Sequence, residues 1–130
     1  MAVIRNYCID SDILIDHLRG VHVARSFFIS ESKKQQGFWI SAVSVAEVYT
    51  GKETRNQKEL RIIDELLEQF VIIDVSTMIA KLGGILRRDY NIPFADAIIA
   101  ATALENKLEV VTRNIKHFDK IKGLKVFKPY

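Results

Sequence analysis

The sequence is poor in cysteine, and this and other absences exclude several classes of protein. Cys8 is the only cysteine among the 130 residues, so neither an intrachain disulfide nor a thiolate cage around a metal ion can form. No run of about 18 apolar residues is present, so no membrane-spanning helix is expected. The N-terminus does not have the basic, apolar and small-residue pattern of a signal peptide. We therefore expect a cytoplasmic protein that does not enter a membrane.

Histidine pairs and glycine-rich loops are missing as well. His17, His22 and His117 are far apart, with no i, i+4 spacing, so a histidine metal site is not indicated. His117 follows other candidate site residues in the sequence, but we assign it a structural role. No glycine-rich loop follows an expected strand, so the phosphate cradle of a nucleotide-binding protein is not supported. Phe38 and Trp39 fit a core strand better than a platform for stacking bases.

Length and charge indicate one globular domain with an uneven charge distribution. A chain of 130 residues is expected to form a single domain, residues 1–130, with a core of its own. The net charge is +3. Residues 107–130 contain seven basic side chains and two acidic ones, a net charge of +5, which leaves −2 for the rest of the chain. Such a basic segment permits contact with a polyanion, although a solvated, lysine-rich sheet edge explains it equally well.

Strands and helices are expected to alternate along the chain. Short apolar runs predict strands, and amphipathic stretches with capping residues predict helices. We expect strands at 3–9, 38–40, 71–73, 109–112 and 124–127. Helices are expected at 12–18 and 21–34, from Ser41 or Ser44, at 57–69, after Ser76 through Tyr90, at 94–106, and as a turn at 114–118. This alternation predicts an α/β fold, a three-layer sandwich around a mostly parallel sheet.

Two adjacent glycines, Gly83 and Gly84, lie in the middle of the helix expected after Ser76. In a helix interior each costs about 1 kcal/mol in helix propensity. They indicate either close packing against a neighbouring element or a kink, and the sequence leaves both interpretations open.

Three acids lie in unusually apolar surroundings. Asp10 ends the first expected strand, Glu47 lies within an apolar helix, and Asp96 lies in the first turn of an alanine-rich helix. Each has a local explanation: Asp10 as a helix cap, Glu47 as a capping-box partner of Ser44, and Asp96 as a first-turn acid favoured by the helix dipole. Three such acids in one short chain instead suggest a shared site. Converging carboxylates repel one another and are usually held together by a hard divalent cation, Mg²⁺ or Mn²⁺.

Four motifs in order resemble those of the PIN-domain family, and most closely the small ribonuclease toxins of VapC-type toxin–antitoxin pairs. The resemblance extends from Val3 to about Val126 and rests on CIDSDILID at 8–16, SAVSVAEV at 41–48, PFADAIIAATALE at 93–105 and VVTRNIKHF at 110–118. It implies a parallel-sheet α/β sandwich, an acidic pocket and Mg²⁺- or Mn²⁺-dependent cleavage of RNA. The implied products carry a 5′-phosphate and a 3′-hydroxyl.

The resemblance also implies roles for individual residues. Asp10, Glu47 and Asp96 match the family's first, second and third acids, as catalytic residues and metal ligands. Ser11 and Thr112 match supporting hydroxyl residues. Asn114 departs from the pattern, because many members have a fourth carboxylate there, and this puts a tightly held second metal ion in doubt. Asp12 and Asp16 have no counterpart, and we expect them to face solvent or the rim of the site.

Contacts with substrate and partners are also expected. Arginine suits bidentate binding of phosphate, so four arginines are candidates for holding RNA, although ordinary surface charge explains any one of them. These are Arg19, Arg87, Arg88 and Arg113. The resemblance further implies an antitoxin protein that blocks the acidic pocket, and a homodimer formed through helix faces.

Two other functions fit part of the sequence. Asp10-Ser11-Asp12 after an apolar strand also resembles the aspartyl-nucleophile motif of haloacid-dehalogenase-type phosphatases. That hypothesis requires a catalytic lysine in a later loop and gives Glu47 no role. The other alternative is a binding module that keeps the fold without catalysis, which the asparagine at position 114 permits.

Overall fold

A single parallel sheet forms the centre of the protein in the computed structural model, which describes residues 3–130. The strands are β1 (Asn6–Ile9), β2 (Gly37–Ser41), β3 (Val71–Ile73), β4 (Glu109–Val111) and β5 (Val126–Phe127). They are arranged in the order β3-β2-β1-β4-β5, and each neighbouring pair is parallel. All five carboxyl ends therefore meet at one edge of the sheet. The expected α/β sandwich is confirmed, and the sheet is parallel throughout.

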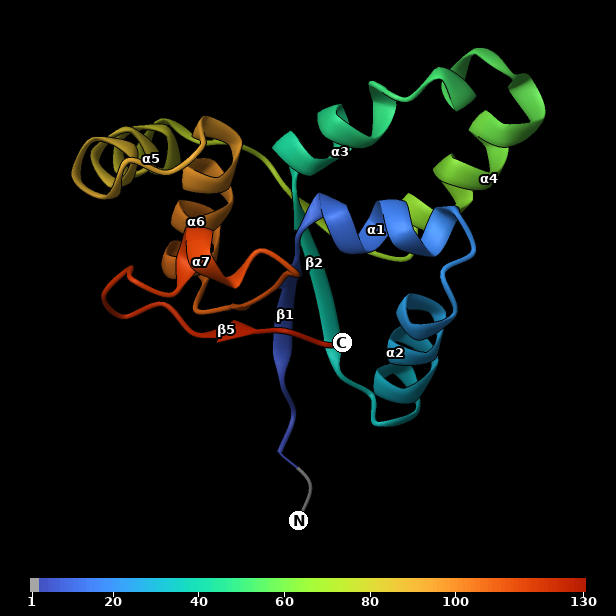
Figure 1. Cartoon of the computed structure of the whole chain (residues 1–130), viewed down its shortest axis with the longest axis horizontal. Coiled ribbons are helices and arrows are strands. Elements are labelled where there is room, and N and C mark those ends of the chain that lie inside the picture. Colours follow the sequence, from blue (N-terminus) through green and yellow to red (C-terminus); the bar gives the residue numbers. More distant parts are fainter. Residues whose placement is uncertain (1–2) are drawn as a thin grey trace.

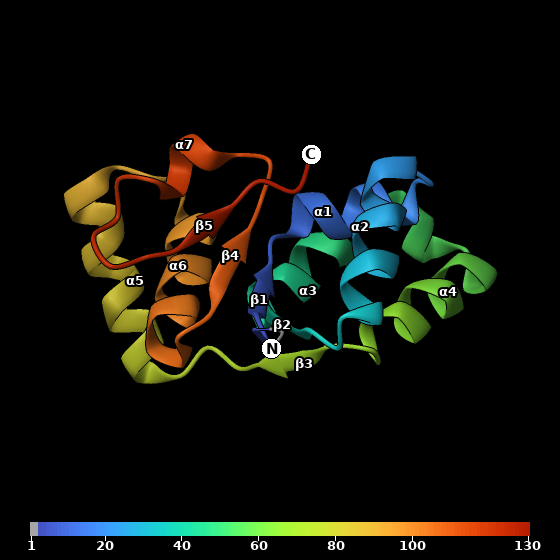
Figure 2. The ribbon, with the colours of Figure 1, turned by 90° about the horizontal axis from the view of Figure 1, so that it is seen from below.

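Helices cover both faces of this sheet (Figures 1 and 2). On one side lie α1 (Ser11–Leu18), α2 (His22–Lys33) and α4 (Gln57–Leu67), and on the other α5 (Thr77–Tyr90), α6 (Phe94–Asn106) and the short α7 (Ile115–Phe118). The helix α3 (Ala42–Tyr49) contacts both α1 and α6, so it crosses from one layer to the other above the carboxyl end of β2. A 3₁₀ turn, Lys52–Arg55, links α3 to α4. Within residues 3–130, no helix is both long and apolar enough to span a membrane.

Alternating side chains of the central strands divide the core into two halves. Tyr7 and Ile9 of β1 pack with α1, α2, α3 and α4, whereas Cys8 packs with α5 and α6. This is the period of two that a strand buried on both faces requires. Cys8 is fully buried, as expected for a small hydrophobe in the first strand. Because both faces of β1 are covered, the end of this strand is held firmly.

Most element boundaries agree with the sequence-based expectations. The first strand begins at Asn6 rather than Val3, because Asn6 is the first residue opposite β2, where it pairs with Gly37. Of the two serines considered as the start of the next helix, Ser41 is the cap, accepting a hydrogen bond from Val43 N at 3.1 Å. The helix expected at 57–69 ends at Leu67.

The two adjacent glycines of α5 have different surroundings. A Cβ atom built on Gly83 would lie 2.7 Å from Ile98 Cδ1 on α6, which is too close, whereas one on Gly84 would meet nothing within 4 Å. The helix α5 is continuous from Thr77 to Tyr90. Close packing against α6 therefore explains Gly83. Nothing in the structure explains Gly84.

We predict opposite effects for alanine at these two positions. Gly84→Ala should raise the free energy of unfolding by about 0.5–1 kcal/mol, since it improves helix propensity in open space. Gly83→Ala gains the same propensity but overpacks the buried α5–α6 contact, which costs about 1–3 kcal/mol, so it should destabilise the protein. Urea unfolding of the two variants beside the parent measures the difference. Equal stabilisation by both substitutions would show that the helices are not packed as closely as described.

Candidate functional site

The candidate site lies where strand order changes direction around β1. The chain places β2 and β3 on one side of β1, and β4 and β5 on the other. In open α/β sheets, ligands bind outside the carboxyl ends of the strands at such a switch point. Asp10 follows the last residue of β1, and Thr112 follows the last residue of β4. The first candidate acid is therefore positioned by the two central strands of the sheet.

Asp10 is buried and hydrogen-bonded by its neighbours. Its residue exposure is 3%. Thr112 Oγ1 donates to Oδ2 at 2.8 Å, and the backbone N–H of Ser11 donates to Oδ1 at 2.8 Å. Asp10 is also the N-cap of α1, so the capping explanation is correct and is compatible with a place in a site. Burial, followed by the nearby charge of Asp12, raises the pKa of Asp10 from 3.8 to about 7.

Ser11 connects Asp10 to Glu47. The Ser11 hydroxyl donates to Glu47 Oε1 at 2.9 Å, and Ser11 Oγ also lies 3.5 Å from Asp10 Oδ1. Ser44 is buried inside α3, and its hydroxyl has no partner among the described residues, so the Ser44–Glu47 capping box does not form. Glu47 instead points across to α1. Its pKa is raised by burial, with smaller contributions from Asp96 and Asp12.

Asp96 is held by a histidine that the sequence analysis assigned to structure. Asp96 lies in the first turn of α6, and its Oδ2 is 2.5 Å from Nδ1 of His117 on α7. Burial raises the pKa of Asp96, and the contact with His117 opposes that rise. The pairing joins α6 to α7 over 21 residues of sequence. No local pattern predicts it, although the position of His117 close behind Thr112 and Asn114 is the one available signal.

Of the two settings expected for Asp12 and Asp16, solvent and the rim of the site, the structure has the second. Their side chains are only 15% and 14% exposed. Asp12 accepts a hydrogen bond from the backbone N–H of Arg113 at 3.0 Å, and Asp16 pairs with Arg113 Nε at 2.8 Å. Tyr130 donates to Asp16 at 2.7 Å. These acids thus fasten α1 to the chain that follows β4 and to the C-terminal residue, beside Asp10.

The other predicted site residues lie in different settings. Asn114 is exposed, and its backbone N–H donates to Thr112 Oγ1 at 2.9 Å, which orients the hydroxyl that serves Asp10. Arg19 lines a small groove beside Glu47. Arg87 donates to the carbonyl oxygen of Ile92 at 2.7 Å, and Arg88 pairs with Asp89 on the exposed surface of α5.

The donor set fits a hard cation. Four carboxylates gather at this edge, and burial or mutual repulsion raises the pKa of each: Asp10, Asp12, Glu47 and Asp96. Asp12 Oδ1 is buried with no hydrogen-bond partner. Oxygen ligands that repel one another suit Mg²⁺ or Mn²⁺. Within residues 3–130, no three His, Cys, Asp or Glu side chains lie in an arrangement that could hold a metal ion as they stand, so binding would require some of these side chains to move.

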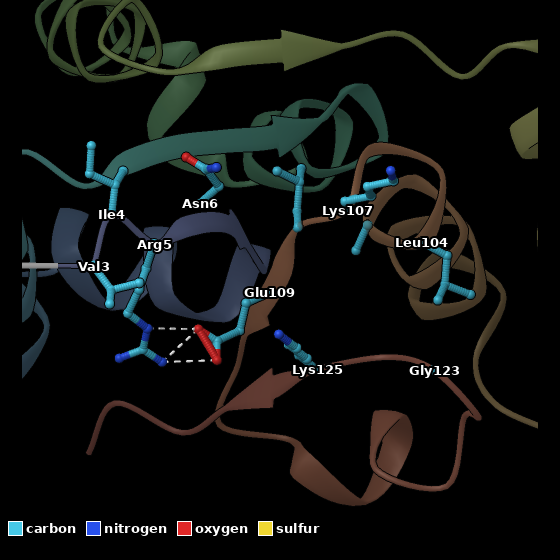
Figure 3. Close-up of a pocket in the computed structure, with 11 residues that line it drawn as sticks. Val3, Ile4, Arg5, Asn6, Leu104, Lys107, Glu109, Gly123 and Lys125 are labelled. Carbon is cyan, nitrogen blue, oxygen red and sulfur yellow. Dashed lines mark hydrogen bonds and ion pairs between the residues drawn. The ribbon is translucent and has the colours of Figure 1, made fainter.

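Another pocket lies at the opposite, amino end of the sheet (Figure 3). It has a volume of about 520 Å³ and is bordered by the ion pair between Arg5 and Glu109, in which the closest N–O distance is 2.5 Å. Lys107 and Lys125 also line it. None of the candidate acids Asp10, Glu47 and Asp96 lines this pocket. It is therefore separate from the candidate site at the carboxyl edge of the sheet.

Known proteins share this fold and sequence. The family profile of the PIN domain matches residues 7–124. The chain is 37% identical over 122 residues to ribonuclease VapC10 of Mycobacterium tuberculosis, covering 90% of this chain and 89% of that protein. Among solved structures, it resembles a toxin–antitoxin complex from Klebsiella pneumoniae with a TM-score of 0.79 and 32% identity, covering 96% of this chain and 98% of that one. VapBC2 of Rickettsia felis bound to promoter DNA matches with a TM-score of 0.74 and 26% identity, covering 93% and 96%.

The raised pKa of Asp10 predicts the direction in which pH changes stability. The folded chain binds this proton more tightly than the unfolded chain does, so in metal-free buffer stability is lost as pH rises from about 4 through 7. Asp10→Asn removes the ionisation and should stabilise the protein at pH 8 by up to about 4 kcal/mol. Urea unfolding with a chelator, at pH 5 and pH 8, measures this. The exposed Asp119→Asn should keep the parent's pH dependence; if Asp10→Asn keeps it too, Asp10 is not the group responsible.

Proposed function

The chain belongs to the PIN-domain family, and from that premise we propose that it is a divalent-metal-dependent endoribonuclease, the toxin of a type II toxin–antitoxin pair. The observation that carries the proposal is the bridge at the carboxyl edge of the sheet, where the Ser11 hydroxyl binds Glu47 while Thr112 binds Asp10. Curated relatives named ribonucleases support it. Residues 1–130 would act as one nuclease domain, in the cytoplasm, where RNA is available.

We propose Asp10, Glu47 and Asp96 as the ligands of Mg²⁺ or Mn²⁺. Such an ion, when bound, polarises a phosphoryl oxygen and lowers the pKa of a bound water. Positive charge at this point also favours the ionised form of Asp10, whose pKa of about 7 otherwise leaves about half of it protonated near neutrality. Asp10 or Glu47 would orient the attacking water, whose in-line attack on phosphorus would break the bond to the 3′-oxygen and leave a 5′-phosphate and a 3′-hydroxyl.

The remaining residues hold these carboxylates in place. Thr112 fixes Asp10, Ser11 fixes Glu47, and His117 fixes Asp96. Supporting hydrogen bonds of this kind orient ligands for a metal and commonly change its affinity by about 10–100-fold when removed. Asn114 supplies a backbone donor to Thr112 but no negative charge, which favours one tightly held ion over two.

We propose a cognate antitoxin and a second copy of the chain as protein partners. Several similar structures are toxin–antitoxin complexes, which supports the first. Exposed apolar side chains on the helical layers could pack against the antitoxin and against a second copy of the chain. On α5 and at the start of α6 these are Met78, Ile85 and Phe94, which are 62%, 43% and 64% exposed.

The two alternatives differ in how they use the site. In an aspartyl phosphatase Glu47 has no role, whereas here Glu47 binds the serine next to Asp10, which favours the nuclease. A binding module without catalysis would keep every contact described and still cleave no RNA. Metal-dependent turnover is therefore the property that separates it from the nuclease.

We predict that RNA cleavage requires both the ion and the three acids. With Mg²⁺ or Mn²⁺ the purified chain should fragment single-stranded RNA, and a chelator should stop it. Asp96→Asn, Asp10→Asn or Glu47→Gln should each lower the rate by roughly 100-fold or more, because several kcal/mol of transition-state stabilisation are lost. Gel analysis of labelled RNA measures the rate, and the matched surface variant Asp119→Asn should retain it. A folded parent with no metal-dependent cleavage would establish the binding module instead. Release of phosphate from a phosphomonoester that survives Glu47→Gln but not Asp10→Asn would support the aspartyl phosphatase.

Metal binding should also be visible without any substrate. Mn²⁺ at 100 times its dissociation constant is expected to stabilise the folded chain by about 2.7 kcal/mol, measured as a rise in the thermal unfolding midpoint at pH 7.5. Asp10→Asn should lose most of this rise, and Asp119→Asn should show it in full. An equal rise in both variants would mean that the ion binds elsewhere.

A further inference from the structure

A second, basic pocket adjoins the candidate acids. It lies where β4 leads into α7, has a volume of about 360 Å³, and includes two residues that reach the site: Asn114, bonded to Thr112, and His117, bonded to Asp96. We call it the α7 pocket. Its lining is Arg113, Asn114, Ile115, Lys116, His117 and Lys128.

Positive charge in the α7 pocket is only partly neutralised. Arg113 is paired with Asp16. Lys116 and Lys128 are exposed and form no ion pair within residues 3–130, and no acid lines the pocket. Two unpaired ammonium groups therefore line a pocket that also includes His117, the partner of Asp96.

The groove on the other side of Glu47 has the opposite charge. Its lining includes three acids, Glu47, Glu53 and Glu59, and one cation, Arg19. A phosphodiester strand placed across the acids would be repelled on that side and attracted on the α7 side. The charges thus give the site two unlike flanks.

We propose that Lys116 and Lys128 bind backbone phosphates of the RNA next to the scissile one, and so determine the side of the site along which the strand lies. The inference rests on the proposed function and extends it to two residues outside the acidic site. Lysine binds phosphate as a compact point charge through counterion release, without reading the base. The two lysines are positioning residues, since they touch neither the acids nor the reacting atoms.

Binding measured without cleavage tests this directly. Fluorescence anisotropy of a labelled single-stranded RNA, with the chelator present, gives affinity as a function of salt. The double variant Lys116→Gln/Lys128→Gln should bind on the order of tenfold more weakly in 0.1 M salt, and the slope of log K against log salt should fall by about 1.4. Lys116→Arg/Lys128→Arg should restore both values.

A charge-matched pair provides the control. Lys107→Gln/Lys125→Gln removes the same charge from the pocket at the amino end of the sheet (Figure 3) and should change neither slope nor affinity appreciably. Equal losses in the two double variants would reduce the effect to net charge and overturn the proposal, as would an unchanged slope in Lys116→Gln/Lys128→Gln. If the parent binds RNA with this slope but cleaves none, the proposed nuclease fails while the α7 pocket stands. If the parent binds no RNA, both fail.

Discussion

The hydrogen bond from Thr112 to Asp10 is the contact on which the rest of the site depends. It joins the ends of the two central strands, which are 102 residues apart in sequence, at 2.8 Å. In the parallel pairing of β1 with β4, Ile9 lies opposite Val111. The residues that follow them, Asp10 and Thr112, therefore lie side by side. Because β1 is covered on both faces, Asp10 cannot move out to water. A slip of one residue would turn Asp10 to another face and remove its donor.

Confining charge in this way makes stability and function oppose each other. Burial raises the pKa of Asp10, and repulsion from Asp12 and Asp96 adds to this rise. The free energy of unfolding is therefore lowered at the pH where the ionised acids are needed. Two devices limit the cost without removing the acids. Hydrogen bonds from Thr112 and Ser11 favour the charged form of Asp10, and Arg113 offsets the charge of Asp12 and Asp16. His117 does the same for Asp96 in part, and no basic side chain is paired with Asp10 or Glu47 within residues 3–130.

The sequence predicts the fold well because each element has a local signal. Apolar runs alone predict the strands at 38–40 and 71–73. The second occurs with these bounds as β3, and the first occurs as β2, one residue longer at each end. Side-chain partners are different, because they depend on where distant segments come to lie. Asp12 and Asp16 look like surface acids until the C-terminal residue, Tyr130, and Arg113 are seen to cover them. Their burial is a property of the tertiary structure.

The same distinction explains what the sequence could and could not say about charge. The basic excess from residue 107 onward can be read from the sequence. Its distribution in space cannot, because β4 and β5 each carry the chain from the amino end of the sheet to the carboxyl end. Lys107 and Lys125 end at the amino edge, whereas Lys116 and Lys128 end beside the acids. Adjacent positive and negative surfaces raise the local concentration of a polyanion without drawing it onto the carboxylates themselves. An RNA strand held by the α7 pocket would thus approach the acids from the side where its own charge is balanced, and the ion would have to neutralise only the phosphate that reaches them.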